Sequence, residues 1–563
     1  MTEFILTLAA VFITAGILLL VANHLGFPSV PFYIIAGLIT GAIVSPDELL
    51  DLALWGIAFL VFVFGTEVDI GDVQLVIRDG EGAAFTQLII VAPISFVSGY
   101  LLAEFIGIAD PFRNALYFSA AATLSSTLVG SHILEAEIRK NLVYGRLASS
   151  VHFFDDIVAI GALLVLSAEV LTDIQLLTSK IGFGFLFLVA GLLIYRHGYP
   201  LLIRATGGGD ELMLMGSISI LIAFLAAAEY VGISIVVGAF AAGIAVRGEG
   251  GGSLGVRNGI RSIRDFFAAI FFVTVGALVT IPTIEVLLFA GILILLVTVI
   301  NPTILSTAFI MEGYDGRTGI LAGSSLNQVS ELAIVIAIQA FLIGTISPTL
   351  FDAIILAAAV TMILSAVAGR YEQRVYELLL SPVIADRTDF IDDHSSVNEQ
   401  LSDHVVIIGY GRLCRQLTQT LAELDVSYVV IENDPALQQD LSDCQNHVFG
   451  DAMASYPLEL ARVGEARLII SPVDHQPVSA SLLRIDTDAD RILRASSSQV
   501  GMELLTDGAT FVIVPSVMAS HQLSTLVERV LADEVELEQI QATHRDYMRL
   551  LELAGLQRRL GQL

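Results

Sequence analysis

The sequence predicts a polytopic α-helical membrane domain with an inverted repeat and interrupted helices, followed by an α/β Rossmann-like domain. Of its 563 residues, 55% are hydrophobic and the mean hydropathy is +0.78, which is more apolar surface than a soluble chain can bury. Charged residues are denser in the C-terminal part of the chain. There are 27 acids and 14 bases before Tyr371, and 30 acids and 14 arginines in the shorter remainder. In that remainder, an apolar strand leads directly into a Gly-rich turn at 405–411.

Thirteen apolar runs, bounded by Gly, Pro or charged residues, are long enough to be membrane spans. They cover residues 4–23, 29–45, 52–66, 83–106, 112–133, 143–167, 178–196, 211–228, 231–247, 265–280, 284–309, 317–343 and 346–368. Residues 1–22 lack the basic region and the small-residue cleavage site of a signal peptide, which favours a first span over a removed leader.

The distribution of basic residues between loops predicts the orientation of the spans. Loops after odd-numbered runs carry eleven such residues and loops after even-numbered runs carry two: Arg78, Arg139, Lys140, Arg146, Arg196, Arg204, Arg247, Arg257, Arg261, Arg264 and Arg317, against Arg113 and Lys180. Because positive loops stay inside, we expect the amino terminus outside and the acidic carboxyl-terminal domain in the cytoplasm.

Runs 1–6 and 8–13 can be superposed as two halves, with run 7 as the connector. Because seven is odd, the halves run in opposite directions, which is the inverted-repeat plan of many secondary transporters. Polar interruptions lie at matching places, TLSST at 123–127 in run 5 and SLNQVSE at 325–331 in run 12. Freed carbonyls and polar side chains at such breaks can coordinate a dehydrated cation.

Asp155 and Asp156 are adjacent in the apolar run 143–167. A charged residue at the bilayer centre costs about 3 kcal/mol or more, so one that is kept there is a candidate functional residue. Consecutive helical residues point about 100° apart, so one aspartate could face an ion path while the other contacts a broken helix. We expect a proton and a monovalent cation to compete for at least one of them; the alternative is a buried Asp that only pins crossing helices.

The polar neighbours of the two aspartates leave alternatives open. His152, one turn away, could titrate with them or only pack. Ser125, Ser126 and Thr127 are candidate ion ligands, or they satisfy backbone groups at the break. Glu331 is favoured as a partner of the opposite broken helix over a direct ion ligand.

The remainder of the chain begins with a polar, acidic segment and then shows a strand–turn–helix–strand pattern over 403–435. Gly409 permits a tight turn, and Gly411 lets the backbone approach a phosphate at a helix N-terminus, with Arg412 and Leu413 in the same candidate loop. Glu432, 21 residues after Gly411, is placed to accept hydrogen bonds from ribose hydroxyls. The domain could instead be a scaffold that only dimerises.

The membrane runs resemble the monovalent cation:proton antiporter-2 family, Kef-type branch. The motifs occur in the family's order: FVFGTEVD at 62–69, TLSST at 123–127, FFDDIVAI at 153–160, VGAFAAGI at 237–244, FFVTVGA at 271–277 and NQVSELA at 327–333. The resemblance implies a homodimer in which a core bundle with crossed broken helices moves against a dimerisation bundle. It also implies that Asp156 binds the cation, as the only metal ligand carried over by position, with Asp155 beside it.

Two residues depart from the family pattern. Kef-type members usually have Gln before the essential Asp, whereas this chain has Asp155. Paired aspartates resemble the electrogenic sodium–proton members, but those carry a Lys in the second half, and here Asn301 is the nearest polar residue in that helix. The sequence therefore leaves the choice between K⁺ and Na⁺, and the stoichiometry, open.

The soluble part resembles the regulator of potassium conductance (RCK, or TrkA-N) domain. The resemblance extends to HVFGDAM at 447–453, RLIISPVD at 467–474 and a final strand and helix at 508–523. It implies that Asp451 lies near the adenosine end of a regulatory nucleotide, NAD(H) or AMP/ATP, with no catalytic cofactor. The predicted division is a membrane domain 1–370, a cytoplasmic linker 371–400, a nucleotide-binding domain 401–521 and a helical tail 522–563.

The net charge of −29, with two lysines among 28 bases, argues against nucleic acid as a partner and suits a high-salt cytoplasm, or only a preference for Arg codons. Together these features predict a non-enzymatic, multi-pass protein of the plasma membrane that exchanges K⁺ or Na⁺ for protons under the control of a nucleotide. The alternatives are an RCK-gated potassium channel and a membrane-anchored NAD-dependent enzyme.

Overall fold

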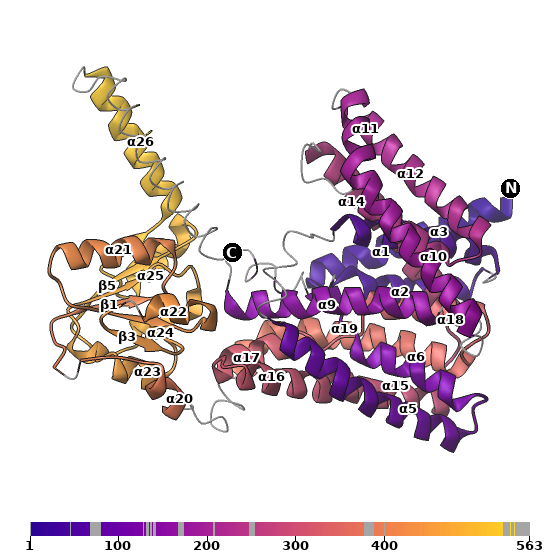
Figure 1. The fold of residues 1–563 in the computed structure, drawn as a ribbon, viewed down its shortest axis with the longest axis horizontal. Coiled ribbons are helices and arrows are strands. Elements are labelled where there is room, and N and C mark those ends of the chain that lie inside the picture. The colour runs from indigo at the N-terminus through magenta and orange to yellow at the C-terminus, as the bar shows by residue number, and fades with distance from the viewer. Residues whose placement is uncertain are drawn as a thin grey trace. The chain divides into compact units, whose positions relative to one another are not determined.

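The computed structural model describes residues 2–44, 47–67, 80–127, 129–130, 134, 138, 142–166, 174–206, 209–246, 254–375, 388–398, 400–442, 444–532, 541 and 545. The chain forms two compact units, Met1–Asp386 and Arg387–Leu563. The first is helical and the second is built around a parallel sheet (Figure 1).

Helices occupy all thirteen of the predicted apolar runs. In chain order they are α1 (Thr2–Leu25), α2 (Ser29–Gly41), α3 (Asp47–Glu67), Gly80–Ile106 with η1 (Gln87–Val91) and α5 (Ala92–Ile106), α6 (Pro111–Thr123), α9 (Val143–Leu166), α10 (Ile174–Leu193) with η2 (Ile194–Gly198) and α11 (Tyr199–Thr206), α12 (Asp210–Val231), α13 (Ile235–Ala245), α14 (Leu254–Leu278), α15 (Ile284–Leu295) with η3 (Leu296–Ile300) and α16 (Asn301–Met311), α17 (Gly316–Ser324), α18 (Glu331–Leu342) and α19 (Pro348–Val375).

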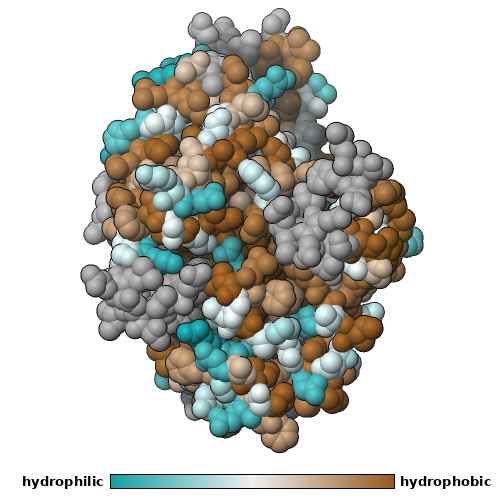
Figure 2. All heavy atoms as spheres, turned by 90° about the vertical axis from the view of Figure 1, so that its right-hand side faces the viewer, coloured by the Kyte–Doolittle hydropathy of each residue, from teal (hydrophilic) through white to brown (hydrophobic). Residues whose placement is uncertain are grey.

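Six helices of the described residues are long and apolar enough to cross a membrane: Leu6–Leu25, Gly80–Ile106, Thr178–Ala205, Asp210–Val231, Ile284–Met311 and Pro348–Tyr371. The other runs form helices that are shorter, that are interrupted or that, like α9 with 24 residues and α14 with 25, carry several charged residues. Large apolar side chains are exposed on the outer helices, Leu20 and Phe105 among them, and apolar side chains dominate the face in Figure 2. An apolar exterior of this extent requires lipid around it.

Helix packing repeats between the two halves. α2 packs on α14, and the corresponding pair is α13 on α3; α5 packs on α6, and the corresponding pair is α16 on α17. The α2–α14 contact and the α3–α13 contact both depend on glycine. A Cβ at Gly37 would lie 2.1 Å from the Val273 carbonyl oxygen, and one at Gly243 would lie 2.1 Å from that of Phe62. The predicted inverted repeat is therefore visible in the packing.

Two π-helical segments also correspond between the halves, whereas a third, η2, follows α10 in the connecting run. η1 in run 4 precedes Pro93, and η3 in run 11 precedes Pro302. Proline has no N–H to donate and crowds the preceding turn, which favours a local π-bulge.

The second unit contains a six-stranded parallel sheet in the order β3-β2-β1-β4-β5-β6. Its strands are β1 (Val405–Ile408), β2 (Tyr428–Glu432), β3 (His447–Phe449), β4 (Leu468–Ser471), β5 (Asp490–Arg494) and β6 (Phe511–Ile513). Alternate residues of β1 enter two different apolar clusters, Val406 and Ile408 in one and Val405 and Ile407 in the other. Both faces are thus buried, as expected of a doubly wound parallel sheet.

The helices of this unit are α20 (Thr388–Asp393), α21 (Arg412–Glu423), η5 (Pro435–Leu437), α22 (Gln438–Leu441), α23 (Ser455–Leu460), η6 (Val463–Glu465), α24 (Gln476–Leu483), α25 (Ser498–Thr506) and α26 (Pro515–Leu531). The predicted linker contributes to the fold, because Ser396 pairs antiparallel with His447 on the edge strand β3. Helix α26 starts before the predicted tail, and residues 534–540 of that tail lie outside the described residues.

Candidate functional site

The two predicted interruptions cross each other. Helix α6 ends at Thr123, α17 ends at Ser324 and α18 begins at Glu331. Between these helices, Ser125 forms an antiparallel bridge with Val329, and the Ser330 amide donates to the Leu124 carbonyl at 3.1 Å. Short extended segments from opposite halves therefore satisfy one another's backbone groups, which is how interrupted helices are tolerated in a membrane.

Asp155 on α9 is buried against the first interruption. Its Oδ2 accepts from the Ser125 amide at 2.9 Å and from the Ser125 hydroxyl at 2.5 Å. The Ser125 hydroxyl also lies 3.1 Å from His152 Nδ1. Because the hydroxyl hydrogen is directed to Asp155, the His152 Nδ1 is assigned as the donor to Ser125.

Asp156 is more accessible and contacts a different residue of the same interruption. It is half-buried, and its Oδ1 accepts from the Thr127 hydroxyl at 2.9 Å. The two aspartates therefore both contact the first interruption, two residues apart. Ser125 donates to Asp155 twice, whereas Asp156 is half-buried and accepts from Thr127.

Glu331 contacts the opposite broken helix. The Ser126 hydroxyl donates to Glu331 Oε1, and the Val129 amide donates to the same hydroxyl oxygen at 3.1 Å. Glu331 stands in the first turn of α18, whose N-cap is Ser330. A carboxylate is stabilised at that position by the helix dipole.

Three amide side chains at the crossing were not among the candidate ligands. Gln87 donates to the Thr123 carbonyl at 2.5 Å and Asn301 donates to the Leu326 carbonyl at 3.3 Å, each from a helix with a π-helical segment. Gln328 donates to the Ser126 carbonyl at 3.1 Å. The sequence could have pointed to these residues, because Gln or Asn inside an apolar run is expected to be buried and hydrogen-bonded. It could not have identified their hydrogen-bond partners.

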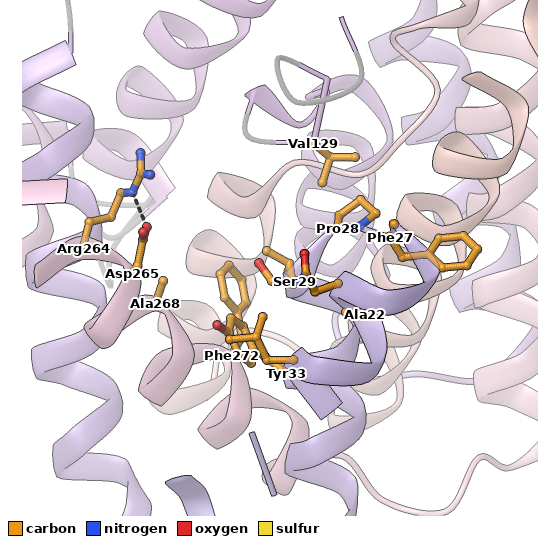
Figure 3. Close-up of a pocket in the computed structure, with 14 residues that line it drawn as sticks. Ala22, Phe27, Pro28, Ser29, Tyr33, Val129, Arg264, Asp265, Ala268 and Phe272 are labelled. Carbon is orange, nitrogen blue, oxygen red and sulfur yellow. Dashed lines mark hydrogen bonds and ion pairs between the residues drawn. The ribbon is translucent and has the colours of Figure 1, made fainter. Parts of the chain in front are cut away.

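A cavity of about 440 Å³ opens beside the crossing. Tyr33, Asp265 and Phe272 line it together with Val129, the residue whose amide bonds Ser126 (Figure 3). Gly26 also lines it, and the Arg370 guanidinium of α19 donates to the Gly26 carbonyl at 2.5 Å. The predicted topology places this end of α1 on the cytoplasmic side.

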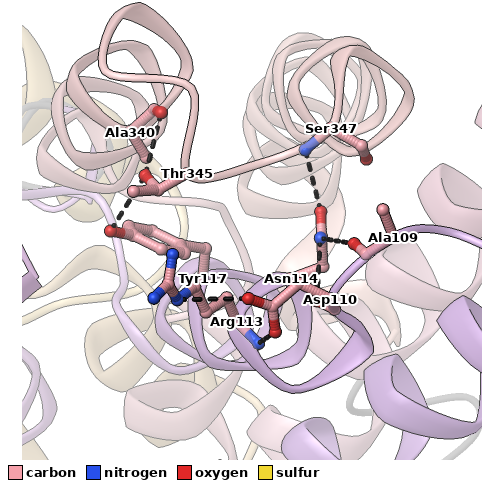
Figure 4. Close-up of polar contacts among 8 residues, drawn as sticks. All are labelled: Ala109, Asp110, Arg113, Asn114, Tyr117, Ala340, Thr345 and Ser347. Carbon is pink, nitrogen blue, oxygen red and sulfur yellow. Dashed lines mark hydrogen bonds and ion pairs between the residues drawn. The ribbon is translucent and has the colours of Figure 1, made fainter. Parts of the chain in front are cut away.

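The opposite end of α6 is tied to the turn between α18 and α19. Asn114 accepts from the Ser347 amide at 2.9 Å, and the Thr345 hydroxyl donates to Tyr117 at 3.3 Å (Figure 4). These bonds link residues more than 200 positions apart and join the two halves at the end predicted to face outside.

In the soluble unit, the Gly-rich loop follows β1 as predicted. Gly409 has φ of +86°, which only glycine adopts without strain, and Gly411 is the N-cap of α21. Glu432, at the end of the neighbouring strand β2, accepts from the Tyr410 amide at 2.6 Å. Burial raises the pKa of the Glu432 carboxyl, and the hydrogen bonds from backbone amides oppose that rise.

Asp451 follows β3, so the predicted residues of the nucleotide loop, Glu432 and Asp451 lie at the carboxyl ends of three adjacent strands. Its Oδ1 accepts from the Met453 amide at 3.0 Å. Arg412 begins α21, with its side chain outside the described residues, and the Leu413 side chain is exposed. The sequence reading missed Arg415, whose guanidinium lies 4.9 Å from the Tyr410 ring centre and pairs with Asp440 at 2.5 Å.

A helical membrane protein in which two inverted halves cross at interrupted helices beside buried carboxylates is, by class, a secondary transporter. The family model described as sodium/hydrogen exchanger, transmembrane, matches residues 8–369, and the TrkA-N domain model matches residues 405–515. The chain belongs to the sodium/hydrogen exchanger family, and its function is cation/proton antiport with a TrkA-N domain attached. The predicted Kef-type resemblance is confirmed.

Individual relatives agree with this assignment. An inferred K(+) efflux antiporter, KefB, of Alkalimonas amylolytica is 26% identical over 529 residues, which are 88% of this chain and 77% of that protein. The glutathione-regulated potassium-efflux system protein KefC of Salmonella schwarzengrund is 25% identical over 495 residues, covering 83% and 75% of the two chains. The sodium proton antiporter MjNhaP1 from Methanocaldococcus jannaschii at pH 8 shares the fold, with a TM-score of 0.50, 16% identity and coverage of 67% of this chain and 99% of that chain.

Proposed function

We propose that the protein exchanges K⁺ or Na⁺ for protons by binding the cation and the proton alternately on Asp156. The observation that carries this proposal is the position of Asp156, half-buried and bonded to Thr127 at the crossing of the interrupted helices. A carboxylate there is shielded enough to hold a proton and open enough to release it to a cation.

Asp156 is preferred over Asp155 as the carrier because their surroundings differ. Asp155 Oδ2 is engaged by both donors of Ser125, so its carboxylate holds the first interruption in place. In the proposed cycle, Asp156 loses its proton, the cation binds it with the hydroxyl oxygens of Ser125, Ser126 and Thr127 nearby, and the core bundle then moves. Glu331 steadies Ser126 during that movement.

The cavity beside Val129 supports an ion entrance on the side that the basic loops predict to be cytoplasmic. The bonds of Asn114 and Tyr117 to the α18–α19 turn support closure of the opposite end. We also propose a plasma-membrane homodimer, from the resemblance to the antiporter family. Its amino terminus lies outside and its soluble domain in the cytoplasm, as the distribution of basic residues between the loops predicts. In the same proposal the domains are 1–370, 371–400, 401–521 and 522–563.

A nucleotide, NAD(H) or AMP/ATP, regulates the exchange in this proposal. The loop at Gly409 and Gly411 leads into the N-terminus of α21, where a phosphate is favoured, and Glu432 and Asp451 stand at the adjacent strand ends. A ligand shifts the transport equilibrium only through different affinities for two conformations. A thermal-shift screen of full-length protein with NADH, NAD, AMP and ATP tests the site, and no stabilisation by any of them contradicts it.

The transport proposal is tested with purified protein in liposomes. Imposed Na⁺ or K⁺ gradients should move protons, and Asp156→Asn should abolish that movement. Full exchange by Asp156→Asn would show that another group is the carrier. A cation current without proton movement would instead indicate a channel.

A further inference from the structure

Gln328 connects the two interrupted helices and the last membrane helix. It lies in the second interruption and is completely buried. Its Nε2 donates to the Ser126 carbonyl in the first interruption at 3.1 Å, and its Oε1 accepts from the Ser365 hydroxyl of α19 at 2.9 Å. The Gln328 side chain therefore links the second interruption, where it lies, to the first interruption and to α19.

The carbonyl that Gln328 holds belongs to the peptide group between Ser126 and Thr127. A displacement of that peptide group also displaces Thr127, whose hydroxyl donates to Asp156 at 2.9 Å. Close packing also restrains Gln328, because a Cβ on Gly130 would lie 3.1 Å from Gln328 Nε2. The position of the Thr127 hydroxyl thus depends on a hydrogen bond from the opposite half of the molecule.

Helix α19 fixes the second interruption at two consecutive residues. Ser365 donates to Gln328, and the Thr361 hydroxyl, one turn earlier on the same face, accepts from the Val329 amide at 3.1 Å. Both hydroxyl side chains are buried. The side chain of Gln328 is therefore held in one orientation by α19 before any ion binds, which is preorganisation of the site.

We propose that Gln328 is a positioning residue that sets the cation affinity of the Asp156 site, and that Ser365 orients it. This inference rests on the proposed function, because it takes Asp156 as the cation carrier. With Gln328 removed, the Ser126 carbonyl retains its bond from the Gly130 amide at 3.0 Å but loses the bond from the opposite half. The peptide between Ser126 and Thr127 is then held less firmly, and so is the hydroxyl oxygen beside Asp156. The effect is on cation affinity rather than on the movement of the core bundle.

The test uses the full-length chain in liposomes, with proton movement measured over a range of Na⁺ and of K⁺ concentrations. Gln328→Met has similar length but no hydrogen-bonding group, and Ser365→Ala removes only the group that orients Gln328. Ser365→Thr keeps a hydroxyl and serves as the conservative rescue. Ser95→Ala is the matched control, because the Ser95 hydroxyl is buried without a hydrogen-bond partner among the described residues.

Both Gln328→Met and Ser365→Ala should raise the KM for the cation about fivefold, the effect of one buried hydrogen bond of about 1 kcal/mol. Their maximal rates should stay near the wild-type value, as should both parameters of Ser365→Thr and Ser95→Ala. An unchanged KM in Ser365→Ala and Gln328→Met would overturn the inference, whatever happens to the maximal rate. If Gln328→Met does not fold, Ser365→Ala decides alone.

A binding measurement separates this inference from the transport proposal. The thermal stabilisation by NaCl and KCl, relative to choline chloride, reports cation affinity even if no exchange occurs. Weaker stabilisation of Ser365→Ala than of wild type supports the positioning role, and equal stabilisation overturns it. Absence of proton movement by the wild-type protein contradicts the transport proposal alone.

Discussion

The Thr127 hydroxyl lies 2.9 Å from Asp156 Oδ1, while Ser125, two residues earlier, bonds Asp155 through both its amide and its hydroxyl. Two residues of the first interruption therefore each contact one of two neighbouring carboxylates on α9. Because the two aspartates contact different residues, their roles in exchange can be tested by separate substitutions.

Thr127→Val should weaken cation binding while leaving the fold intact. The side chain keeps its volume but loses a hydrogen bond to a charged group, worth about 1.5–3 kcal/mol, so the KM for the cation should rise by about tenfold or more. Cation-driven proton movement in liposomes measures it, with Thr127→Ser as the control that keeps the hydroxyl. Equal KM values for the two variants would show that the Thr127 hydroxyl is not part of the site.

Asp155→Asn should retain exchange, whereas Asp156→Asn should lose it. The Asn side chain can place its oxygen where Asp155 Oδ2 now accepts from Ser125, so the first interruption keeps its geometry. Initial rates of both variants at saturating Na⁺ and K⁺ provide the comparison. Loss of exchange in Asp155→Asn with activity in Asp156→Asn would reverse the assignment of the carrier.

Positions of the helices and of the two interruptions could be predicted because polar groups inside long apolar runs are conspicuous. The hydrogen-bond partners of these polar groups could not be predicted. Gln328, for example, bonds Ser126, 202 positions earlier, and no local pattern encodes that contact. Helix α14 begins at Leu254, before the predicted residue 265, because hydropathy locates only the apolar part of a helix whose start carries Arg257 and Arg261. In the sheet, the Gly-rich loop was predictable from φ requirements, whereas the contact of Arg415 with Asp440 depends on tertiary packing.

Gly409→Ala and Gly411→Ala form a matched pair that separates folding from ligand binding. Gly409 has φ of +86° and its Cβ would lie 3.2 Å from Val473, so alanine there should cost about 1–2 kcal/mol. Gly411 has φ of −72° and open space at the Cβ position, so alanine there should be tolerated but should obstruct a phosphate. Hydrogen exchange of β1 and α21 in the full-length protein should increase for Gly409→Ala only.

The nucleotide response provides the second half of that comparison. Gly411→Ala should lose the stabilisation that NADH, NAD, AMP or ATP gives the wild-type protein, although its own hydrogen exchange is unchanged. Retention of a full nucleotide response in Gly411→Ala would indicate that no phosphate approaches this loop.

Glu312→Gln should change how stability depends on pH at the end of α16. Burial raises the pKa of the Glu312 carboxyl to about 7, the Ala83 amide opposes the rise and Glu81 adds to it. Because the pKa is above its ordinary value of 4.5, the folded state favours the protonated acid; this contribution is complete below pH 4.5 and is lost as the pH rises through about 7. Thermal unfolding of the full-length protein at pH 5.5 and pH 8 should therefore show a smaller decrease for Glu312→Gln than for wild type. An identical pH dependence in wild type and Glu312→Gln would show that Glu312 stays ionised in the folded protein.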